Sequence, residues 1–202
     1  MEPIFELFDS VQSFYSEELR ISINFENQNT RVYFSNPLFY NYILVDGEVL
    51  KTILENYNTM DLREPVISAE DHTEFRKGCF YAGKGKSNRK FTHLVKVKKS
   101  KSNGVSEKCK RIQKIWKKGQ GIAVIQLFPE TCEHEALSRE FAIINGLGLE
   151  NLTNIRNSTC HGVMKEAWSK KEIINFGNMI VYRALKMAVL DPPTLIFEKD
   201  IK

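Results

Sequence analysis

The sequence predicts an α/β or α+β domain in which helices flank a small central β-sheet. Short runs of β-branched and aromatic residues lie near positions 40, 80 and 125, and each has the composition of a β-strand. Longer segments with apolar residues three or four positions apart follow these runs, as in amphipathic helices. The order of strands, helices, one strand and further helices suits a sheet that is covered by helices.

The N-terminal part of the chain predicts a helix followed by a β-hairpin, and we treat residues 1–38 as an extension of the main domain. Leu19–Phe25 and Thr30–Phe34 alternate apolar and polar residues on either side of an asparagine-rich turn. The first strand of the main sheet is expected at Tyr40–Val45, which an Asp-Gly pair closes.

The next segment is mixed and polar. A short helix is expected near Val49–Tyr57, followed by a loop through Pro65. A second short strand is expected at Cys79–Ala82, and Gly83 and Gly85 are expected to end it, because glycine weakens a strand.

Two basic helices follow. The first is expected to run from Ser87 or Asn88, either of which can cap it, to about Lys98. After an exposed loop, a second helix is expected over Ser106–Lys118. Its apolar side carries Cys109, Ile112, Ile115 and Trp116.

The C-terminal half predicts one strand and two helices. The strand is expected at Ile122–Phe128. Thr131 is expected to cap a helix that runs to about Asn145 and ends at glycines. A last amphipathic helix is expected over Lys170–Leu190.

The composition is that of one soluble globular domain with short extensions. The chain has 202 residues, of which 42% are hydrophobic and 27% charged, enough to bury a core without disulfides. We place the main domain at residues 39–165 and a C-terminal helical extension, packed on it, at residues 166–202. The acidic start does not resemble a secretory signal, and no apolar run approaches the ~18 residues of a membrane helix. We therefore expect an intracellular protein, nuclear or cytoplasmic, that is neither secreted nor bound to a membrane.

The four cysteines are widely spaced, which indicates reduced thiols inside a cell. Two Cys–His pairs leave a zinc site open, although their spacing matches no standard zinc finger: Cys132 with His134, and Cys160 with His161. The alternative is a pair of partly buried thiols and a pair of surface imidazoles.

The positive charge is concentrated in one segment. Lys84–Lys118 holds fourteen Lys and Arg residues and one acid, Glu107, and so carries +13, which leaves −9 on the rest of a chain of net charge +4. A local field of this size suits a polyanion such as DNA. The alternative is a solvated basic loop or a localisation signal.

Glu140 has an unusual place in the helix that ends near Asn145. On a helical wheel it lies within an apolar stripe made of Ala136, Leu137, Ile143, Ile144 and Leu147. The opposite side carries Glu135, Ser138, Arg139 and Asn145. A carboxylate that faces a core needs a partner, which leaves three candidates: an arginine, a backbone donor or a metal ion.

Arg89 and His93 share one face of the first basic helix, because they are four residues apart. That helix follows a strand and a glycine turn, so its N-terminus offers free N–H groups to a phosphate. The Gly83–Gly85 turn lacks the spacing of a nucleotide-binding P-loop, and we expect no nucleotide cofactor.

Three stretches together resemble the GIY-YIG endonuclease superfamily, most closely the nuclease domains of the animal ankyrin-repeat and LEM-domain endonucleases. Phe80–Leu94 contains Tyr81-Ala82-Gly83, followed by Arg89 and His93. The other two stretches are Lys108–Leu127 and Glu135–Asn154. The resemblance covers about residues 40–162, and the three stretches in this order make a specific signal.

The first triplet departs from the family pattern. We place it at Tyr40-Asn41-Tyr42, where only the final tyrosine matches, so Tyr42 is assigned and Tyr40 is the alternative. Ala82 replaces the usual Ile or Val of the second triplet. The separation of Tyr42 from Tyr81 is also longer than in minimal members of the family.

The resemblance implies that the chain is a metal-dependent DNA endonuclease. Glu140 would hold one Mg²⁺ or Mn²⁺, Arg89 would neutralise charge on the phosphate, and Asn154 would hold the Glu140 region in place. Tyr42 would take a proton from the attacking water with help from His93 or Lys84, and Tyr81 would orient the water or the phosphate. Which tyrosine is the base stays open.

The expected substrate is DNA, recognised by its shape, such as flaps and junctions, because phosphate contacts carry no sequence information. The basic side chains expected to bind it are Lys84, Lys86, Lys90, Lys110, Arg111, Lys114, Lys117 and Lys118. The main alternative is a non-catalytic module that binds DNA or RNA with the same fold. A domain whose basic face binds acidic protein or a membrane surface is a second alternative.

Overall fold

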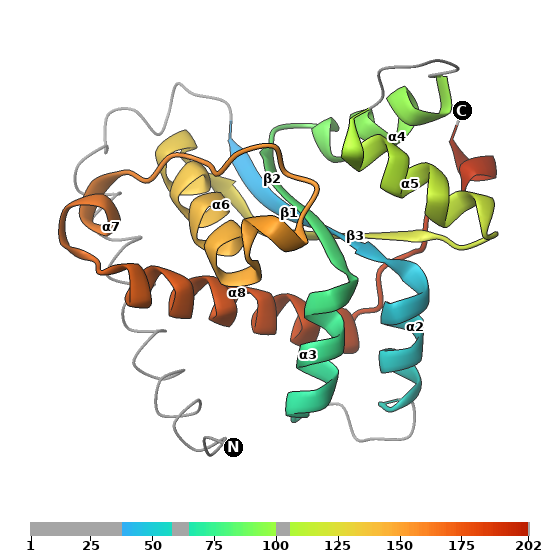
Figure 1. The fold of residues 1–202 in the computed structure, drawn as a ribbon, viewed down its shortest axis with the longest axis horizontal. Helices are drawn as coiled ribbons and strands as arrows, with labels where there is room; N and C mark the ends of the chain where they lie inside the picture. Colours follow the sequence, from blue (N-terminus) through green and yellow to red (C-terminus); the bar gives the residue numbers. More distant parts are fainter. Residues whose placement is uncertain (1–37, 58–64, 100–105, 202) are drawn as a thin grey trace.

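The computed structural model of the protein describes residues 38–57, 65–99 and 106–201. It contains a three-stranded antiparallel sheet in the order β2-β1-β3, with helices on both faces (Figure 1). The strands are β1 (Phe39–Asp46), β2 (Cys79–Gly85) and β3 (Ile122–Thr131). This arrangement confirms the predicted fold class. The N-terminal helix and hairpin lie outside the described residues.

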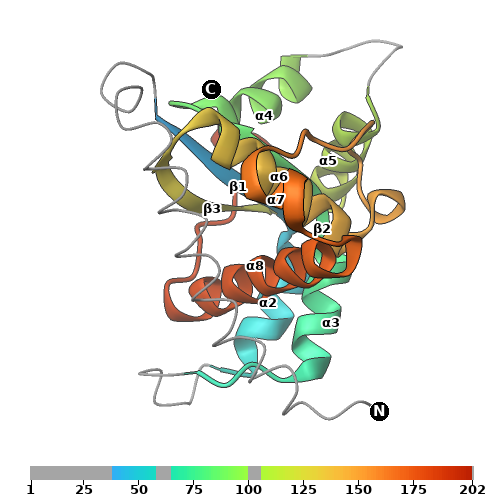
Figure 2. The ribbon, with the colours of Figure 1, turned by 90° about the vertical axis from the view of Figure 1, so that its left-hand side faces the viewer.

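Side-chain alternation along β1 divides the core between the two faces of the sheet. Ile43 and Val45 face one core, and Tyr40, Tyr42 and Leu44 face the other. The first core is completed by α2 (Gly47–Glu55), α3 (Ala69–Gly78), α6 (Glu133–Leu147) and α8 (Lys170–Leu190). The second is completed by α4 (Arg89–Lys99) and α5 (Glu107–Lys117), which lie side by side in Figures 1 and 2. Shorter helical elements are η1 (Leu149–Asn151), α7 (Gly162–Ala167) and η2 (Glu198–Asp200).

Helix α3 was not predicted from the sequence. Its residues are mostly polar, and only Phe75 and Gly78 are buried, so its hydrophobic periodicity is weak. It begins at Ser68, whose hydroxyl accepts a hydrogen bond from the Asp71 backbone N–H at 3.0 Å. The Arg76 side chain links α3 to the end of α6, because it donates a hydrogen bond to the Gly146 carbonyl at 2.7 Å.

One predicted helix cap is wrong. Thr131 is the last residue of β3, and α6 begins after Cys132, which makes no side-chain cap. Helix α4 begins directly after Asn88, one of the two predicted cap residues, whose carbonyl accepts from the Phe91 N–H at 3.0 Å. A long-range contact also stabilises this start, because the Tyr40 hydroxyl donates to the Ser87 carbonyl at 2.7 Å and accepts from the Lys90 N–H at 3.1 Å.

Helices α6 and α8 cross closely because each carries a glycine at the crossing. A Cβ on Gly177 would lie 1.9 Å from the carbonyl oxygen of Ala142, and one on Gly146 would lie 2.6 Å from the Gly177 carbonyl carbon. Glu135, Ser138 and Arg139, which the helical wheel placed on the side opposite Glu140, are also buried. Both sides of α6 are therefore covered by other parts of the protein.

Replacing Gly177 with Ala should lower the free energy of unfolding by about 3 kcal/mol, because two backbones must separate to admit the methyl group. Gly119 is a suitable control. It has a φ of +74°, and a Cβ there would meet nothing within 4 Å, so Gly119→Ala should cost only about 1 kcal/mol from backbone strain. Urea unfolding of both variants measures these changes. Equal decreases in stability would contradict the claim that the crossing requires glycine at position 177.

Helix α8 has the length and composition of a helix that crosses a membrane, contrary to the expectation that the chain has no such segment. Half of its most apolar window is buried inside this structure. Phe176, Ile180 and Ala184 are among its residues in the first core. A long core helix of a globular domain has the same length and apolar composition, and α8 is such a core helix in this structure.

Candidate active site

The predicted site residues lie around β2, the edge strand of the sheet. The loop after α6 covers this edge: the Asn154 side chain accepts from the Ala82 N–H at 3.1 Å and donates to the Ala82 carbonyl at 2.8 Å. Thr153 donates from its backbone and its hydroxyl to the Phe80 carbonyl, at 2.7 and 2.8 Å. The loop satisfies backbone groups that an edge strand would leave unpaired. Asn154 therefore joins β2 to the segment that follows Glu140.

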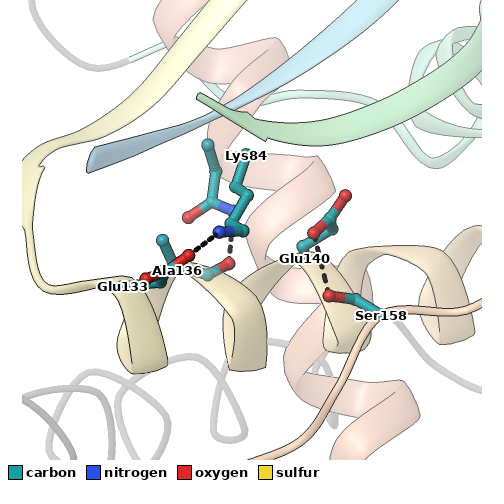
Figure 3. A network of polar contacts seen from close by, with 6 residues as sticks. Lys84, Glu133, Ala136, Glu140 and Ser158 are labelled. Carbon is teal, nitrogen blue, oxygen red and sulfur yellow. Dashed lines mark hydrogen bonds and ion pairs between the residues drawn. The ribbon is translucent and has the colours of Figure 1, made fainter. Parts of the chain in front are cut away.

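Glu140 projects from α6 toward β2, as Figure 3 shows. The Ser158 hydroxyl donates to its Oε2 at 2.8 Å. Burial raises the pKa of this carboxyl group, while hydrogen bonds from Ser158 and the Lys84 backbone, and the charges of Lys84 and Arg89, oppose the increase. The carboxylate is partly buried and makes no ion pair with any residue that the structure describes.

A buried Glu–Arg pair does exist on α6, but it joins Glu135 to Arg139. Both side chains are 4% exposed. The arginine that was one candidate partner for Glu140 therefore pairs with Glu135. The hydrogen-bond donors to Glu140 are the Ser158 hydroxyl and the Lys84 backbone.

Tyr42 and Tyr81 lie side by side, with ring centroids 5.9 Å apart. Gly83 is the residue paired with Tyr42 across the strands. A Cβ on Gly83 would lie 2.8 Å from Tyr81 Cε1 and 3.0 Å from Tyr42 Cζ, so the absence of a side chain there makes room for both rings. Gly85 likewise makes room for Tyr40, since its Cβ would lie 3.0 Å from the Tyr40 hydroxyl. Gly83 lies within β2, contrary to the prediction, whereas β2 does end at Gly85, as predicted.

The two candidates for the first-triplet tyrosine have different surroundings. The Tyr40 hydroxyl is occupied by its two hydrogen bonds at the start of α4. The Tyr42 hydroxyl is buried and lacks a standard hydrogen bond within the described part of the chain. Burial raises its pKa far above that of a free phenol, followed by the effect of Tyr81, whereas the charge of Arg89 lowers it. Burial also raises the pKa of Tyr81, and Arg89 again opposes this.

Arg89 and His93 lie one turn apart on α4, as predicted. Arg89 is exposed, and its positive charge acts on Tyr42, Tyr81 and Glu140 together. The His93 ring meets Tyr81 edge to face at 5.8 Å. Burial, then the charges of Lys108, Arg89 and Lys96, lower the pKa of His93 to about 4, so the imidazole is neutral at pH 7.

Several of the predicted DNA-binding side chains already have protein partners. Lys84 pairs with Glu133, as Figure 3 shows, and Lys90 donates to Gln126. Lys110 pairs with Glu107 at 2.6 Å, and Arg111 pairs with Asp46 at 3.2 Å. The members that are exposed without an ion pair among the described residues are Lys86, Lys114, Lys117 and Lys118.

Lys108 is a basic residue of the site that is absent from the DNA-binding set predicted from the sequence. Its Nζ lies 3.7 Å from the centroid of the Tyr81 ring, a close cation–π contact. Its place two residues before Lys110 puts it on a different side of α5. A search for bases pointing toward the second strand, and not only for the most polar face, could have found it.

The zinc site left open by the sequence has no support in the described residues. The rings of His134 and His161 stack, with centroids 4.6 Å apart and an angle of 15° between their planes. Stacked rings do not direct their nitrogens at a common point. No group of three or more His, Cys, Asp or Glu side chains in the described part of the chain is placed to hold a metal.

Glu140 is consequently the carboxylate on which ligation of a hard cation would depend. Mg²⁺ retains several waters and commonly binds one or two carboxylates together with phosphate oxygens. A partly buried carboxylate without an ion pair suits this mode, because a cation would offset the loss of hydration that raises its pKa. The residues present fit one Mg²⁺ or Mn²⁺ completed by water and substrate.

A family model described as a LEM-3-like GIY-YIG domain matches residues 39–202. The Ankyrin repeat and LEM domain-containing protein 1 homolog of Caenorhabditis elegans is 28% identical over 184 residues, which cover 87% of this chain and 24% of that protein. The Homo sapiens Ankyrin repeat and LEM domain-containing protein 1 is 27% identical over 159 residues, 74% of this chain and 26% of that protein.

The Mus musculus protein of the same name is 26% identical over 166 residues, 81% of this chain and 30% of that protein. The chain thus spans less than a third of the length of each of these relatives. No solved structure matches it.

Proposed function

The chain belongs to the LEM-3-like GIY-YIG domain family, as the resemblance of its motifs predicts, and we propose that it is a metal-dependent endonuclease acting on branched or otherwise structured DNA. The observation that carries the proposal is the placement of Glu140. Its partly buried carboxylate lies at the edge of β2, within electrostatic range of Arg89 and Tyr81. These are the residue types that phosphodiester hydrolysis requires: a cation ligand, a positive charge for the phosphate and hydroxyl groups near the attacking water.

In the proposed mechanism, Glu140 would hold one Mg²⁺ or Mn²⁺. The ion would polarise the scissile phosphate and stabilise the leaving oxygen. Ser158 and the Lys84 backbone hold the Glu140 carboxylate in its orientation. Arg89, which is exposed at the start of α4, neutralises the charge that develops on the phosphate oxygens.

Tyr42 takes a proton from the attacking water, and Tyr81 orients that water or the phosphate. A buried phenol with a raised pKa is a poor base by itself, so the proposal requires the positive charge that lowers the pKa of Tyr42, namely Arg89. His93 supports the tyrosine pair by its ring contact with Tyr81, and its neutral imidazole adds no charge to the site at pH 7. Asn154 keeps β2 and its tyrosine in register with the Glu140 region.

The direct test is incubation of the protein with DNA flaps, junctions and linear duplexes of the same sequence, with Mg²⁺, with Mn²⁺ and with EDTA. We expect cleavage of the branched forms, which depends on the divalent ion, and much slower cleavage of the linear duplex. Binding without cleavage under all conditions would instead identify a non-catalytic nucleic-acid-binding module. Cutting of unbranched duplex at one defined sequence, with branched forms ignored, would contradict the proposed substrate.

A further inference from the structure

Lys108 has a setting that an ordinary surface lysine does not have. It is the second residue of α5, and its ammonium lies over the face of the Tyr81 ring, 3.7 Å from the centroid. The same ring is in edge-to-face contact with His93 and lies beside Tyr42. Lys108 therefore contacts one ring of the tyrosine pair directly from α5.

The charges near Lys108 do not favour its protonated form. No residue that the structure describes forms an ion pair with this ammonium, and Arg89 and Lys96 on α4 place positive charge nearby. Burial, together with Arg89 and Lys96 and against the opposing effects of Cys109 and Glu140, lowers the pKa of Lys108 to about 8. The charged form is thus disfavoured by the folded protein alone, a situation that an incoming anion reverses.

We propose that Lys108 and Arg89 together bind one phosphate of the DNA backbone at the scissile position or next to it. The inference rests on the proposed endonuclease function and adds a second cation to its phosphate site. The two cations come from neighbouring helices, Arg89 from α4 and Lys108 from α5. Together they would hold the phosphate against the tyrosine pair. The aromatic face beneath Lys108 limits where its ammonium can go, which makes it a fixed contact and distinguishes it from the exposed lysines further along α5.

The test compares Lys108→Met, Lys108→Arg and, as a charge-matched control, Lys51→Met. Lys51 is an exposed residue of α2 outside the site. Three quantities are measured: the single-turnover cleavage rate at saturating branched DNA, the salt dependence of DNA affinity in EDTA, and the melting temperature at pH 7.

We expect Lys108→Met to cleave about 10- to 100-fold more slowly, the effect of losing one hydrogen bond to a charged group, and Lys108→Arg to restore most of the rate. The log–log salt slope of Lys108→Met should fall by about 0.9 for one duplex phosphate contact. Its melting temperature should equal or exceed that of the parent, because a disfavoured charge is removed. Lys51→Met should behave as the parent in all three measurements.

A purely structural role for the cation–π contact predicts a different pattern, in which Lys108→Met melts at a lower temperature and cleaves bound DNA at the parent rate; that result would overturn the inference. An unchanged salt slope in Lys108→Met would also overturn it. If the parent protein does not cleave DNA at all, the proposed function fails, and the salt slope alone still decides whether Lys108 binds a phosphate.

Discussion

Replacing Glu140 with Gln is expected to lower the cleavage rate by at least about 10³, which corresponds to several kcal/mol of transition-state stabilisation by a divalent ion. Gln keeps the size of the side chain and its ability to accept from the Ser158 hydroxyl, but it lacks the charge that holds Mg²⁺. Affinity for branched DNA in EDTA should change little. Single-turnover cleavage with Mg²⁺ measures the decrease.

Stability provides an independent readout for this variant. Because the folded protein raises the pKa of Glu140, ionised Glu140 is less favourable in the folded than in the unfolded chain, and Glu140→Gln should melt at the same temperature or higher at pH 7. Mg²⁺ should raise the melting temperature of the parent but not of Glu140→Gln. Glu150→Gln, which changes an exposed carboxylate of η1, serves as the control. Cleavage by Glu140→Gln at the parent rate would rule out the metal-ligand role.

Arg89→Ala is expected to lower the single-turnover rate by about 10²–10³ at saturating DNA, while affinity falls by no more than the loss of one phosphate contact. The reason is its position: the guanidinium acts on Tyr42, Tyr81 and Glu140 at once, and its removal takes away positive charge where the transition state becomes negative. Without Arg89, a smaller fraction of Tyr42 should be ionised and able to accept a proton, because Arg89 lowers the pKa of that phenol.

The matched comparison is a variant in which three exposed or surface-paired lysines of α5 are replaced by Gln: Lys110, Lys114 and Lys117. These charges should act through release of counterions, so the variant should bind more weakly, with a salt slope flatter by up to about 0.9 for each phosphate that is no longer neutralised. Its rate on bound DNA should change little. Arg111 is left in place because it pairs with Asp46. If Arg89→Ala cleaves normally once bound, Arg89 belongs to the general basic surface and has no part in the chemistry.

Local pattern was sufficient for much of the fold. The helix predicted over Lys170–Leu190 has those bounds in the structure, and the strands at β1 and β3 begin within one residue of their predicted starts. Each of these segments buries one continuous apolar face or run. The spacing of apolar residues along the sequence predicts such a face. Helix α3 was missed for the converse reason, since only two of its residues are buried.

The sequence by itself also determined which residues to consider for chemistry. The motif around Tyr81, Arg89 and His93, the carboxylate of Glu140, and the concentration of positive charge are all visible without coordinates. Their roles in catalysis stay predictions, and so does the division of the chain at residues 38 and 165. The helical wheel placed Glu140 among apolar residues of α6, but it did not show that residues on the opposite side, such as Glu135 and Arg139, are buried too.

Only the tertiary structure decided the contacts between segments far apart in the chain. In the folded protein Arg111 forms an ion pair with Asp46, and the Tyr40 hydroxyl accepts a hydrogen bond at the start of α4. The Lys108 ammonium lies over the Tyr81 ring. The fold also requires glycine at position 83 so that two tyrosine rings can lie side by side. The physical reason is that residue spacing records how one element meets a core, whereas the partner of a charge or hydroxyl depends on which other element is packed beside it.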